Sequence, residues 1–212
     1  MRWYTSFLKP ACDRLAALAL LLLCLPLLLL CAGLLALSQR GPLLFVQPRT
    51  GRHGHLFRLV KFRTMCHAYE LPGNLLSEAA RITPVGRWMR YLSLDELPQL
   101  WNVLKGDMSL IGPRPLLPEY VPLYNTAQRR RLDVKPGITG LTQVRGRNAL
   151  RWAHRFRYDT FYVEHISPGL DLQILMSTIF RLIFPGPLHS PEHGLSERFQ
   201  GNLSADLAPS AP

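Results

Sequence analysis

The chain has 212 residues and a formal net charge of +11 at pH 7, with a sequence pI of about 10.1. This length suits one domain with its own hydrophobic core plus a membrane element, and it excludes two full-sized domains. The positive charge calls for an anionic partner: nucleic acid, an anionic bilayer or a phosphorylated substrate. Cys12, Cys24, Cys31 and Cys66 lack CxxC and Cys/His spacing, so the sequence argues against a zinc site or a disulfide framework.

An apolar segment from Leu15 to Leu37 contains only Leu, Ala, Cys, one Pro and one Gly. A straight helix of this length would cross a hydrocarbon core of ~30 Å, and the segment exceeds the ~7–15 residues of a signal-peptide core. Basic residues flank it on both sides, which favours two cytoplasmic ends. Pro26 near its middle favours a bend, so we expect residues 1–40 to form a re-entrant membrane helix. A kinked transmembrane helix is the alternative.

The remainder is predicted to be a compact α/β domain, residues 41–184, with short antiparallel strands and several amphipathic helices. Leu43–Val46 and Phe57–Phe62 are predicted to form a hairpin, joined by a loop that starts at Pro48. Thr83-Pro84 begins a predicted helix with basic and aromatic sides, as expected of a helix lying on a bilayer. Beyond the domain, residues 185–212 lack periodicity and are predicted to form a flexible tail.

A second helix is predicted from Asp95 to Gly106, with Pro98 tolerated in its first turn. Gly112–Pro115 is expected to be a rigid loop, and Pro136–Gly140 is rich in turn residues. Three further segments are predicted to be helical: residues 121–132, 156–164 and 170–183.

Asp95 and Glu96 are adjacent carboxylates, and two compatible interpretations apply to them. Ser93-x-x-Glu96 has the form of a capping box, and acidic side chains suit a helix start. A carboxylate held still at that position is also suited to act as a nucleophile or as a Mg²⁺ ligand.

Several cations are candidates for a phosphate site. Arg114 lies between two prolines that restrict its backbone, so its guanidinium is prepared for bidentate phosphate binding. Arg90 precedes the carboxylates, and Lys61 and Arg63 alternate along a predicted strand, where a solvated edge explains them equally well. The run of arginines at residues 129–131 is expected to be a solvated or lipid-headgroup surface.

The segment from residue 135 to 148 combines glycines, which let a backbone approach a ligand, with polar side chains. Ordinary turns explain the glycines about as well. It has neither a Walker loop nor a dinucleotide fingerprint, and the scattered histidines receive no role. The candidates for nucleotide or sugar binding are Gly137, Thr139, Gly140, Gln143 and Arg147.

Five segments in this order resemble the motifs of the bacterial sugar transferase family: Lys61–Met65, Ser93–Val103, Gly106–Ser109, Gly112–Pro115 and Pro136–Gly140. The resemblance extends from about Lys9 to Ile183. The small members of this family are monotopic phosphoglycosyl transferases that initiate glycoconjugate assembly. The resemblance implies a catalytic domain on the cytoplasmic face of the bacterial inner membrane, a re-entrant helix and Mg²⁺. Two positions depart from the family pattern, Leu25 in place of Ser before the proline and Arg145 in place of Asn.

The resemblance also implies the reaction. Sugar-1-phosphate would pass from a UDP-sugar to polyprenyl (undecaprenyl) phosphate through an aspartyl-phosphosugar intermediate, with release of UMP. Asp95 would be the nucleophile and a metal ligand. Glu96 would be its partner, either as a second metal ligand or as the base that deprotonates the incoming lipid phosphate. Arg114, and more weakly Arg63, Arg90 and Lys61, would hold phosphoryl oxygens.

The sugar is expected to be an N-acetylated amino sugar, and the product would feed O-antigen, capsule, exopolysaccharide or glycoprotein synthesis. The expected partners are the UDP-sugar, polyprenyl phosphate, inner-leaflet lipid and downstream glycosyltransferases, with no nucleic acid. The alternative is a non-enzymatic, membrane-tethered basic scaffold that binds anionic lipid.

Overall fold

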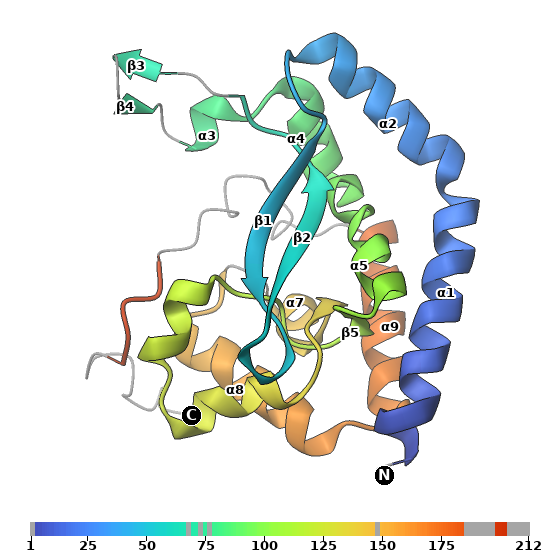
Figure 1. Ribbon diagram of the computed structural model, residues 1–212, viewed down its shortest axis with the longest axis vertical. Helices are drawn as coiled ribbons and strands as arrows, with labels where there is room; N and C mark the ends of the chain where they lie inside the picture. The colour runs from blue at the N-terminus through green and yellow to red at the C-terminus, as the bar shows by residue number, and fades with distance from the viewer. Residues whose placement is uncertain are drawn as a thin grey trace.

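The computed structural model describes residues 3–66, 69–71, 74–75, 78–146, 149–184 and 198–202. In these ranges helices dominate, and the strands form three two-stranded sheets. Figure 1 shows two N-terminal helices as a long bent arm along one side, with a central hairpin and the C-terminal helices below it. This mixture of helices and short strands agrees with the predicted α/β class.

The N-terminal arm consists of a π-helical turn at Tyr4–Leu8, helix α1 (Lys9–Leu23) and helix α2 (Leu25–Ser38). No single described helix has the length and apolar composition to cross a membrane, but the two parts of the arm together do, with a bend of 60° between them. The break lies at Cys24, since Pro26 in the first turn of α2 has no N–H to offer the preceding turn. The bend is therefore where the sequence predicts it, and the re-entrant path stays a prediction.

The central hairpin pairs β1 (Leu44–Thr50) with β2 (Leu56–Phe62) in antiparallel register. A 3₁₀ turn at Arg52–Gly54 joins them. The hairpin is confirmed, but the prediction that its loop starts at Pro48 is wrong, because β1 continues through it. A two-stranded sheet has free edges on which proline is tolerated.

Asn102 closes one edge of this hairpin. Its Oδ1 accepts a hydrogen bond from the backbone N–H of Val60 at 3.1 Å, and its Nδ2 donates to the carbonyl of Arg58 at 2.7 Å. The side chain is 1% exposed. One buried amide thus substitutes for a third strand and joins β2 to helix α5 (Gln99–Lys105).

Three short elements follow β2: β3 (Tyr69–Leu71), β4 (Asn74–Leu75) and α3 (Glu78–Arg81). Helix α4 (Pro84–Tyr91) follows, and its N-cap is Thr83, whose Oγ1 accepts from the N–H of Gly86 at 3.0 Å. The predicted helix start is confirmed.

The predicted helix from Asp95 to Gly106 is two elements. Leu94–Glu96 forms a 3₁₀ turn, and α5 begins only at Gln99, because Pro98 has no N–H with which to continue one helix through residues 94–102. Ser93 adopts a left-handed conformation with φ of 57° and makes no capping hydrogen bond, so the predicted capping box is wrong. The predicted end at Gly106, with φ of 96°, is confirmed.

The predicted loop at residues 112–115 is confirmed, since these residues have no regular structure, but the turn-rich segment Pro136–Gly140 contains a strand. β5 (Ser109–Ile111) pairs in parallel with β6 (Gly137–Thr139). A Cβ on Gly137 would lie 2.1 Å from the backbone nitrogen of Gly112, and a Cβ on Gly140 would lie 2.1 Å from the carbonyl oxygen of Gly112. The glycines are therefore required by contact between two backbones.

The predicted helix at residues 121–132 is helical over most of its length, but it is not one continuous helix. The chain forms a 3₁₀ helix at Pro118–Leu123, a short helix α6 (Thr126–Arg129) and another 3₁₀ turn at Arg130–Asp133. Asn125 is extended and starts α6 with a capping box to Gln128, with bonds of 2.9 and 3.0 Å.

The remaining helices are α7 (Leu141–Arg145), α8 (Trp152–His165) and α9 (Pro168–Ile183). The sequence missed α7, while α8 and α9 confirm and lengthen the predicted helices. Of the predicted flexible tail, residues 198–202 are described: Phe199 is 5% exposed and packs in an aromatic cluster on α8.

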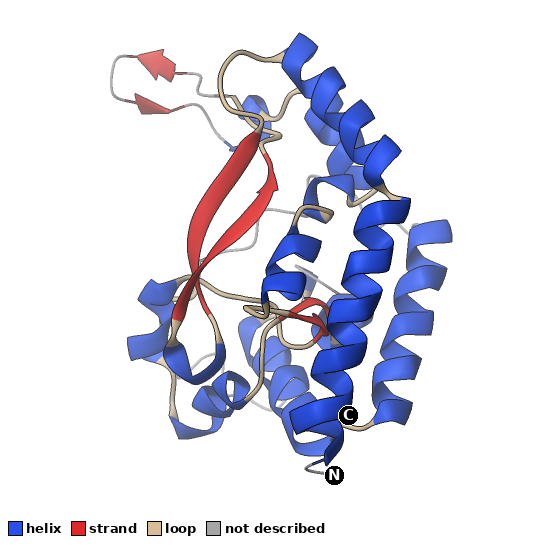
Figure 2. Cartoon of the chain, turned by 45° about the vertical axis from the view of Figure 1, so that its right-hand side comes forward, coloured by secondary structure: helices blue, strands red, loops and turns tan. Residues whose placement is uncertain are grey.

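The main core lies between α1, β2 and α5, and a second cluster joins α2 to β2 and α4. Their buried members are Ala17, Phe57, Leu59, Leu100, Val103 and Met108, and Cys31, Leu35, Phe62 and Met89. The arm therefore packs on the rest of the molecule along one side. Figure 2 shows the arm to the right of the hairpin, with α9 alongside α1.

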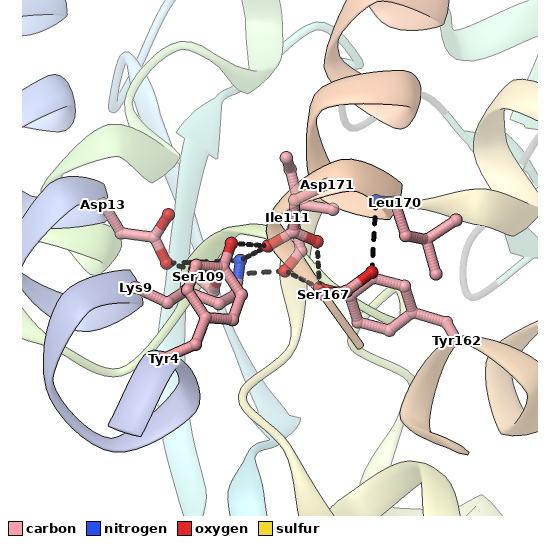
Figure 3. A network of polar contacts seen from close by, with 9 residues as sticks. All are labelled: Tyr4, Lys9, Asp13, Ser109, Ile111, Tyr162, Ser167, Leu170 and Asp171. Carbon is pink, nitrogen blue, oxygen red and sulfur yellow. Dashed lines mark hydrogen bonds and ion pairs between the residues drawn. The ribbon is translucent and has the colours of Figure 1, made fainter. Parts of the chain in front are cut away.

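A buried polar network fixes the lower end of the arm (Figure 3). Asp171, in the first turn of α9, accepts hydrogen bonds from Tyr4 at 2.6 Å, Lys9 at 2.7 Å and Tyr162 at 2.7 Å. Asp13 of α1 accepts from Ser109 at 2.5 Å. The arm is thereby joined to α8, α9 and β5, the strand that leads into residues 112–115.

Candidate active site

The two carboxylates lie on the turn between α4 and α5. Asp95 is 7% exposed, and the side chain of Glu96 is 23% exposed. Burial, and next the charge of Glu96, raise the pKa of Asp95 to about 6. Lys61, Arg90 and Arg114 act in the opposite direction and favour the ionised form. A buried carboxylate is thus kept ionisable by cations from three separate elements.

Arg114 is the nearest of these cations to Glu96. Its Nη2 donates to Glu96 Oε1 at 2.7 Å, and its side chain is about half exposed, at 48%. The charge of Glu96 raises the pKa of Arg114. The predicted grouping of the proline-flanked arginine with the carboxylates is present, and the exposed part of the Arg114 side chain is open to a ligand.

Lys61 approaches from the end of β2. Burial lowers the pKa of its ammonium group, although Asp95 and Glu96 act to raise it. Its Nζ also lies 5.3 Å from the ring centre of Phe45. A partly desolvated ammonium beside two carboxylates is well suited to meet an anionic ligand.

Arg90 comes from the last turn of α4, and its Nε donates to Thr64 Oγ1 at 2.8 Å. The helix reaches Thr64 because Gly86 has no side chain: a Cβ there would lie 2.2 Å from the Thr64 carbonyl oxygen. Sequence reasoning missed this role of Gly86, although a glycine inside a helix often marks close packing.

Arg63 is not brought to the carboxylates. Its Nη2 donates to the carbonyl of Arg40, its own carbonyl accepts from Gln39 Nε2 at 2.5 Å, and its guanidinium lies against Gly41. The alternation that placed Lys61 and Arg63 on one side applies only within a strand, and β2 ends at Phe62. Arg63 joins the end of α2 to the end of β2.

Of the predicted nucleotide or sugar residues, Gly137 and Gly140 serve the backbone contact with Gly112. Thr139 Oγ1 lies 2.8 Å from Thr178 Oγ1 on α9. These three positions therefore have structural partners that account for them, and their predicted binding role gains no support.

Gln143 differs from those three. It is 8% exposed, and neither its amide oxygen nor its nitrogen has a hydrogen-bond partner among the described residues. Its Oε1 lies 3.0 Å from the position that a Cβ on Gly140 would take, beside Gly112 and the loop that carries Arg114. An unpaired buried amide is costly unless a ligand satisfies it. Arg147 lies outside the described residues.

Sequence reasoning missed two cations. Burial, and then the charge of Arg114, lower the pKa of Arg49, to about 10, and of Arg155. Arg49 lies on β1 and donates to Gln47 Oε1 at 2.8 Å. Arg155 lies on α8 and stacks over Trp152, 4.6 Å from the ring centre. No local pattern singles out either residue, because they reach the site from elements far apart in the sequence.

The arginine run was predicted to be a solvated or headgroup surface, and this is wrong for Arg131. Arg131 is 4% exposed and forms an ion pair with Asp159 of α8 at 2.9 Å. Arg130 fits the prediction, since its side chain is 53% exposed and pairs with Glu164 at the surface. A short 3₁₀ turn points neighbouring residues in different directions.

Asp95 and Glu96 fit a Mg²⁺ site of a particular kind. The described residues contain no group of three or more His, Cys, Asp or Glu side chains that could form a closed metal cage. Mg²⁺ commonly binds one or two carboxylates and completes its shell with substrate phosphates and water. Two adjacent carboxylates with cations around them match that second arrangement.

Comparison with known proteins identifies the family. The bacterial sugar transferase family model matches residues 4–185. The uncharacterized sugar transferase EpsL of Bacillus subtilis is 50% identical over 161 residues, which cover 76% of this chain and 80% of EpsL. The undecaprenyl-phosphate galactose phosphotransferase of Salmonella typhimurium is 38% identical over 191 residues, which cover 82% of this chain and 40% of that protein.

A third relative is the UDP-N-acetylgalactosamine-undecaprenyl-phosphate N-acetylgalactosaminephosphotransferase of Aeromonas hydrophila. It is 39% identical over 189 residues, which cover 85% of this chain and 44% of that protein. The match to named transferases rules against the predicted alternative of a non-enzymatic scaffold. The chain belongs to the bacterial sugar transferase family, as its motifs predicted, and it is a transferase enzyme.

Proposed function

We propose that this protein transfers a sugar-1-phosphate from a UDP-sugar to undecaprenyl phosphate, with Asp95 as the nucleophile. The observation that carries the proposal is the buried Asp95 carboxylate, which has a raised pKa and is faced by Lys61, Arg90 and Arg114. Burial removes the water that would otherwise solvate the carboxylate, so it is reactive once ionised. The names of two relatives, which include undecaprenyl-phosphate phosphotransferase activity, support the substrate class.

In the first half-reaction, an Asp95 carboxylate oxygen forms a bond to the β-phosphorus of the UDP-sugar. The bond from this phosphorus to the bridging oxygen breaks, and UMP leaves with that oxygen. In the second, an oxygen of undecaprenyl phosphate attacks the same phosphorus and displaces Asp95. The product is undecaprenyl-diphosphate-sugar, and the enzyme is regenerated.

The surrounding residues have distinct roles in this scheme. Arg114, Arg90 and Lys61 hold phosphoryl oxygens and stabilise the charge that develops on them. Asp95 and Glu96 would hold Mg²⁺, which supplies charge neutralisation at the diphosphate. Gln143 would satisfy its buried amide on the nucleotide or the sugar.

The arm would place this chemistry at the depth of the lipid phosphate. One side of α1 and α2 packs on the domain, while Leu22, Leu23 and Leu29 are exposed. Trp88 and Tyr91 of α4 are also exposed, near the site, as aromatic side chains at a membrane interface are. We propose that the arm enters and leaves the cytoplasmic leaflet of the inner membrane on the same side.

The test is intact-mass measurement of the protein in detergent with Mg²⁺ and a UDP-sugar, without lipid acceptor. The expected result is a mass increase of one phosphosugar with release of one UMP per active site, and neither with Asp95→Asn. Asp133→Asn, at an exposed position at the end of the 3₁₀ turn after α6, is the control and should form the adduct normally. UMP release that is coupled to lipid but leaves no adduct on the protein would contradict the covalent route.

The sugar carried by the UDP-sugar is determined by the part of the site that contacts the ring and its substituents. The names of the Salmonella typhimurium and Aeromonas hydrophila relatives specify galactose and N-acetylgalactosamine, so the family includes transferases for sugars with and without an N-acetyl group. We propose an N-acetylated amino sugar, and the adduct mass obtained with a panel of UDP-sugars identifies it directly.

A further inference from the structure

A buried ion pair stands directly behind the candidate active site. Arg131 and Asp159 are 3% and 6% exposed at their side chains, and both Nε and Nη2 of Arg131 donate to Asp159 Oδ2, at 3.1 and 2.9 Å. The other carboxylate oxygen accepts from Thr142 Oγ1 at 2.7 Å. Both carboxylate oxygens of Asp159 therefore accept hydrogen bonds. The ion pair joins three elements: α7, α8 and the 3₁₀ turn that follows α6.

The same guanidinium holds the backbone of the candidate phosphate-binding residue. Arg131 Nη2 donates to the carbonyl oxygen of Arg114 at 2.7 Å, and Nη1 donates to the hydroxyl of Tyr124 at 3.2 Å. The rings of Tyr124 and Phe156 lie 5.8 Å from the guanidinium carbon. Arg131 thus contacts the main chain of Arg114, while the side chain of Arg114 extends to Glu96.

A buried ion pair is seldom a net source of stability, because both ions lose their hydration on folding. Apolar residues of similar size commonly serve as well in a core. What apolar residues cannot do is donate a hydrogen bond in a fixed direction to the Arg114 carbonyl. The planar guanidinium of an arginine can donate to this carbonyl and bind a carboxylate at the same time. A lysine ammonium has no such planar set of donors.

We propose that Arg131, oriented by Asp159, is a positioning residue that fixes the Arg114 loop so that the Arg114 guanidinium meets the transferring phosphoryl group. This inference rests on the proposed function of Arg114. The prolines on either side of Arg114 limit its backbone torsions, but they do not fix where the loop lies. Arg131 supplies that fixed point from the far side of the loop.

The decisive variant is Arg131→Lys, which keeps the positive charge beside Asp159 and loses the planar set of donors. Displacing a reacting or stabilising group by about 1 Å typically lowers the rate by ~10²-fold. We expect UMP release per active site to fall by about that factor with little change in KM for the UDP-sugar. The final adduct yield counts active sites, so a loss of folded protein is separated from a loss of rate.

Arg130→Lys is the matched control, because it is the same substitution one residue earlier in an exposed pair with Glu164. It should leave kcat, KM and adduct yield unchanged. A double-mutant cycle with Arg114→Met then asks whether Arg131 acts through Arg114. We expect Arg131→Lys to have no further effect on kcat in the Arg114→Met background. If the kcat of the double variant falls by the product of the two single-variant factors, Arg131 does not act through Arg114 and the proposal is overturned.

A readout without catalysis keeps this inference separate from the proposed reaction. Hydrogen exchange of the backbone amides of Gly112, Arg114, Leu116 and Leu117 should speed up in Arg131→Lys and stay unchanged in Arg130→Lys. If wild-type protein forms no adduct, the aspartyl route is wrong, whatever the exchange result. If exchange in the loop and kcat are both unchanged in Arg131→Lys, the positioning role is wrong. If Arg131→Lys does not fold, Asp159→Asn replaces it, with the same measurements and the same two outcomes.

Discussion

Arg114 Nη2 lies 2.7 Å from Glu96 Oε1, and this ion pair joins the loop after β5 to the turn that carries Asp95. The Arg114 side chain is about half exposed, and its guanidinium has more N–H donors than the one bound to Glu96, so it can hold Glu96 and still donate to a ligand. The pair places the candidate nucleophile and the candidate phosphate clamp on one piece of structure, although their elements are separated by the whole of α5.

Replacement of Arg114 tests that arrangement. Arg114→Met should lower UMP release by ~10²–10³-fold, the loss typical when one group that stabilises developing charge is removed. Arg114→Lys should recover only part of the rate, since an ammonium lacks the two parallel N–H donors with which a guanidinium binds two phosphoryl oxygens. Steady-state UMP release measures both, with Arg52→Met as control, because Arg52 donates to the Asp133 carbonyl at the hairpin tip. Equal rates for Arg114→Lys and wild type would contradict a bidentate role.

The raised pKa of Asp95 predicts a pH-dependent gain in stability for Asp95→Asn. The folded-state pKa of about 6 exceeds the ordinary value of 3.8, so the folded protein binds this proton more tightly than the unfolded chain. The wild-type free energy of unfolding therefore falls as the pH rises from about 4 to 6, by up to about 3 kcal/mol. At pH 8 Asp95→Asn should be more stable than wild type by an amount of that order, and at pH 4 the two should be equal.

Thermal unfolding in detergent with EDTA measures this difference, since a bound cation would lower the pKa of the carboxylate. Asp133→Asn should show no such gain. A stability difference between Asp95→Asn and wild type that does not change with pH would mean that the carboxylate is not held in a desolvated site.

Gly86→Ala should reduce both stability and activity. The new Cβ would lie 2.2 Å from the Thr64 carbonyl oxygen, which is backbone and cannot move aside, so α4 must shift and carry Arg90 with it. Overpacking of this kind typically costs about 1–3 kcal/mol. Gly169→Ala in α9 is the control, because no atom of the surrounding structure lies within 4 Å of the position that its Cβ would take. Thermal unfolding and UMP release should distinguish the two variants.

Phe199→Ala should destabilise the protein even though Phe199 belongs to the predicted flexible tail. Its ring lies 5.0 Å from that of Phe156 and 5.3 Å from that of Trp152, and it is 5% exposed. Removal of a buried phenylalanine typically costs about 3–5 kcal/mol. Phe184→Ala is the control, since Phe184 is 61% exposed. Equal thermal midpoints for Phe199→Ala and wild type would show that the tail contributes nothing to the fold.

Sequence alone predicted the features that depend on neighbouring residues. The start of α4 at Thr83-Pro84, the end of α5 at Gly106, the β1–β2 hairpin and the bend beside Pro26 each follow from the torsions and hydrogen bonds of a few adjacent residues. The family and the candidate carboxylates were equally accessible, because they occur as short motifs in order. The same local reasoning failed where a left-handed Ser93 and Pro98 split one expected helix in two.

Tertiary structure decided which of the candidate cations meet. Lys61, Arg90 and Arg114 converge on Asp95, while Arg63 turns away to the end of α2. Arg49 of β1 and Arg155 of α8 also lie close enough to Arg114 for its charge to lower their pKa values. Arg131, predicted to be at the surface, forms a buried ion pair with Asp159. The sequence by itself determines which charges are present and what their neighbours allow. Their distances and burial depend on contacts between segments far apart in the chain, and only folding brings those segments together.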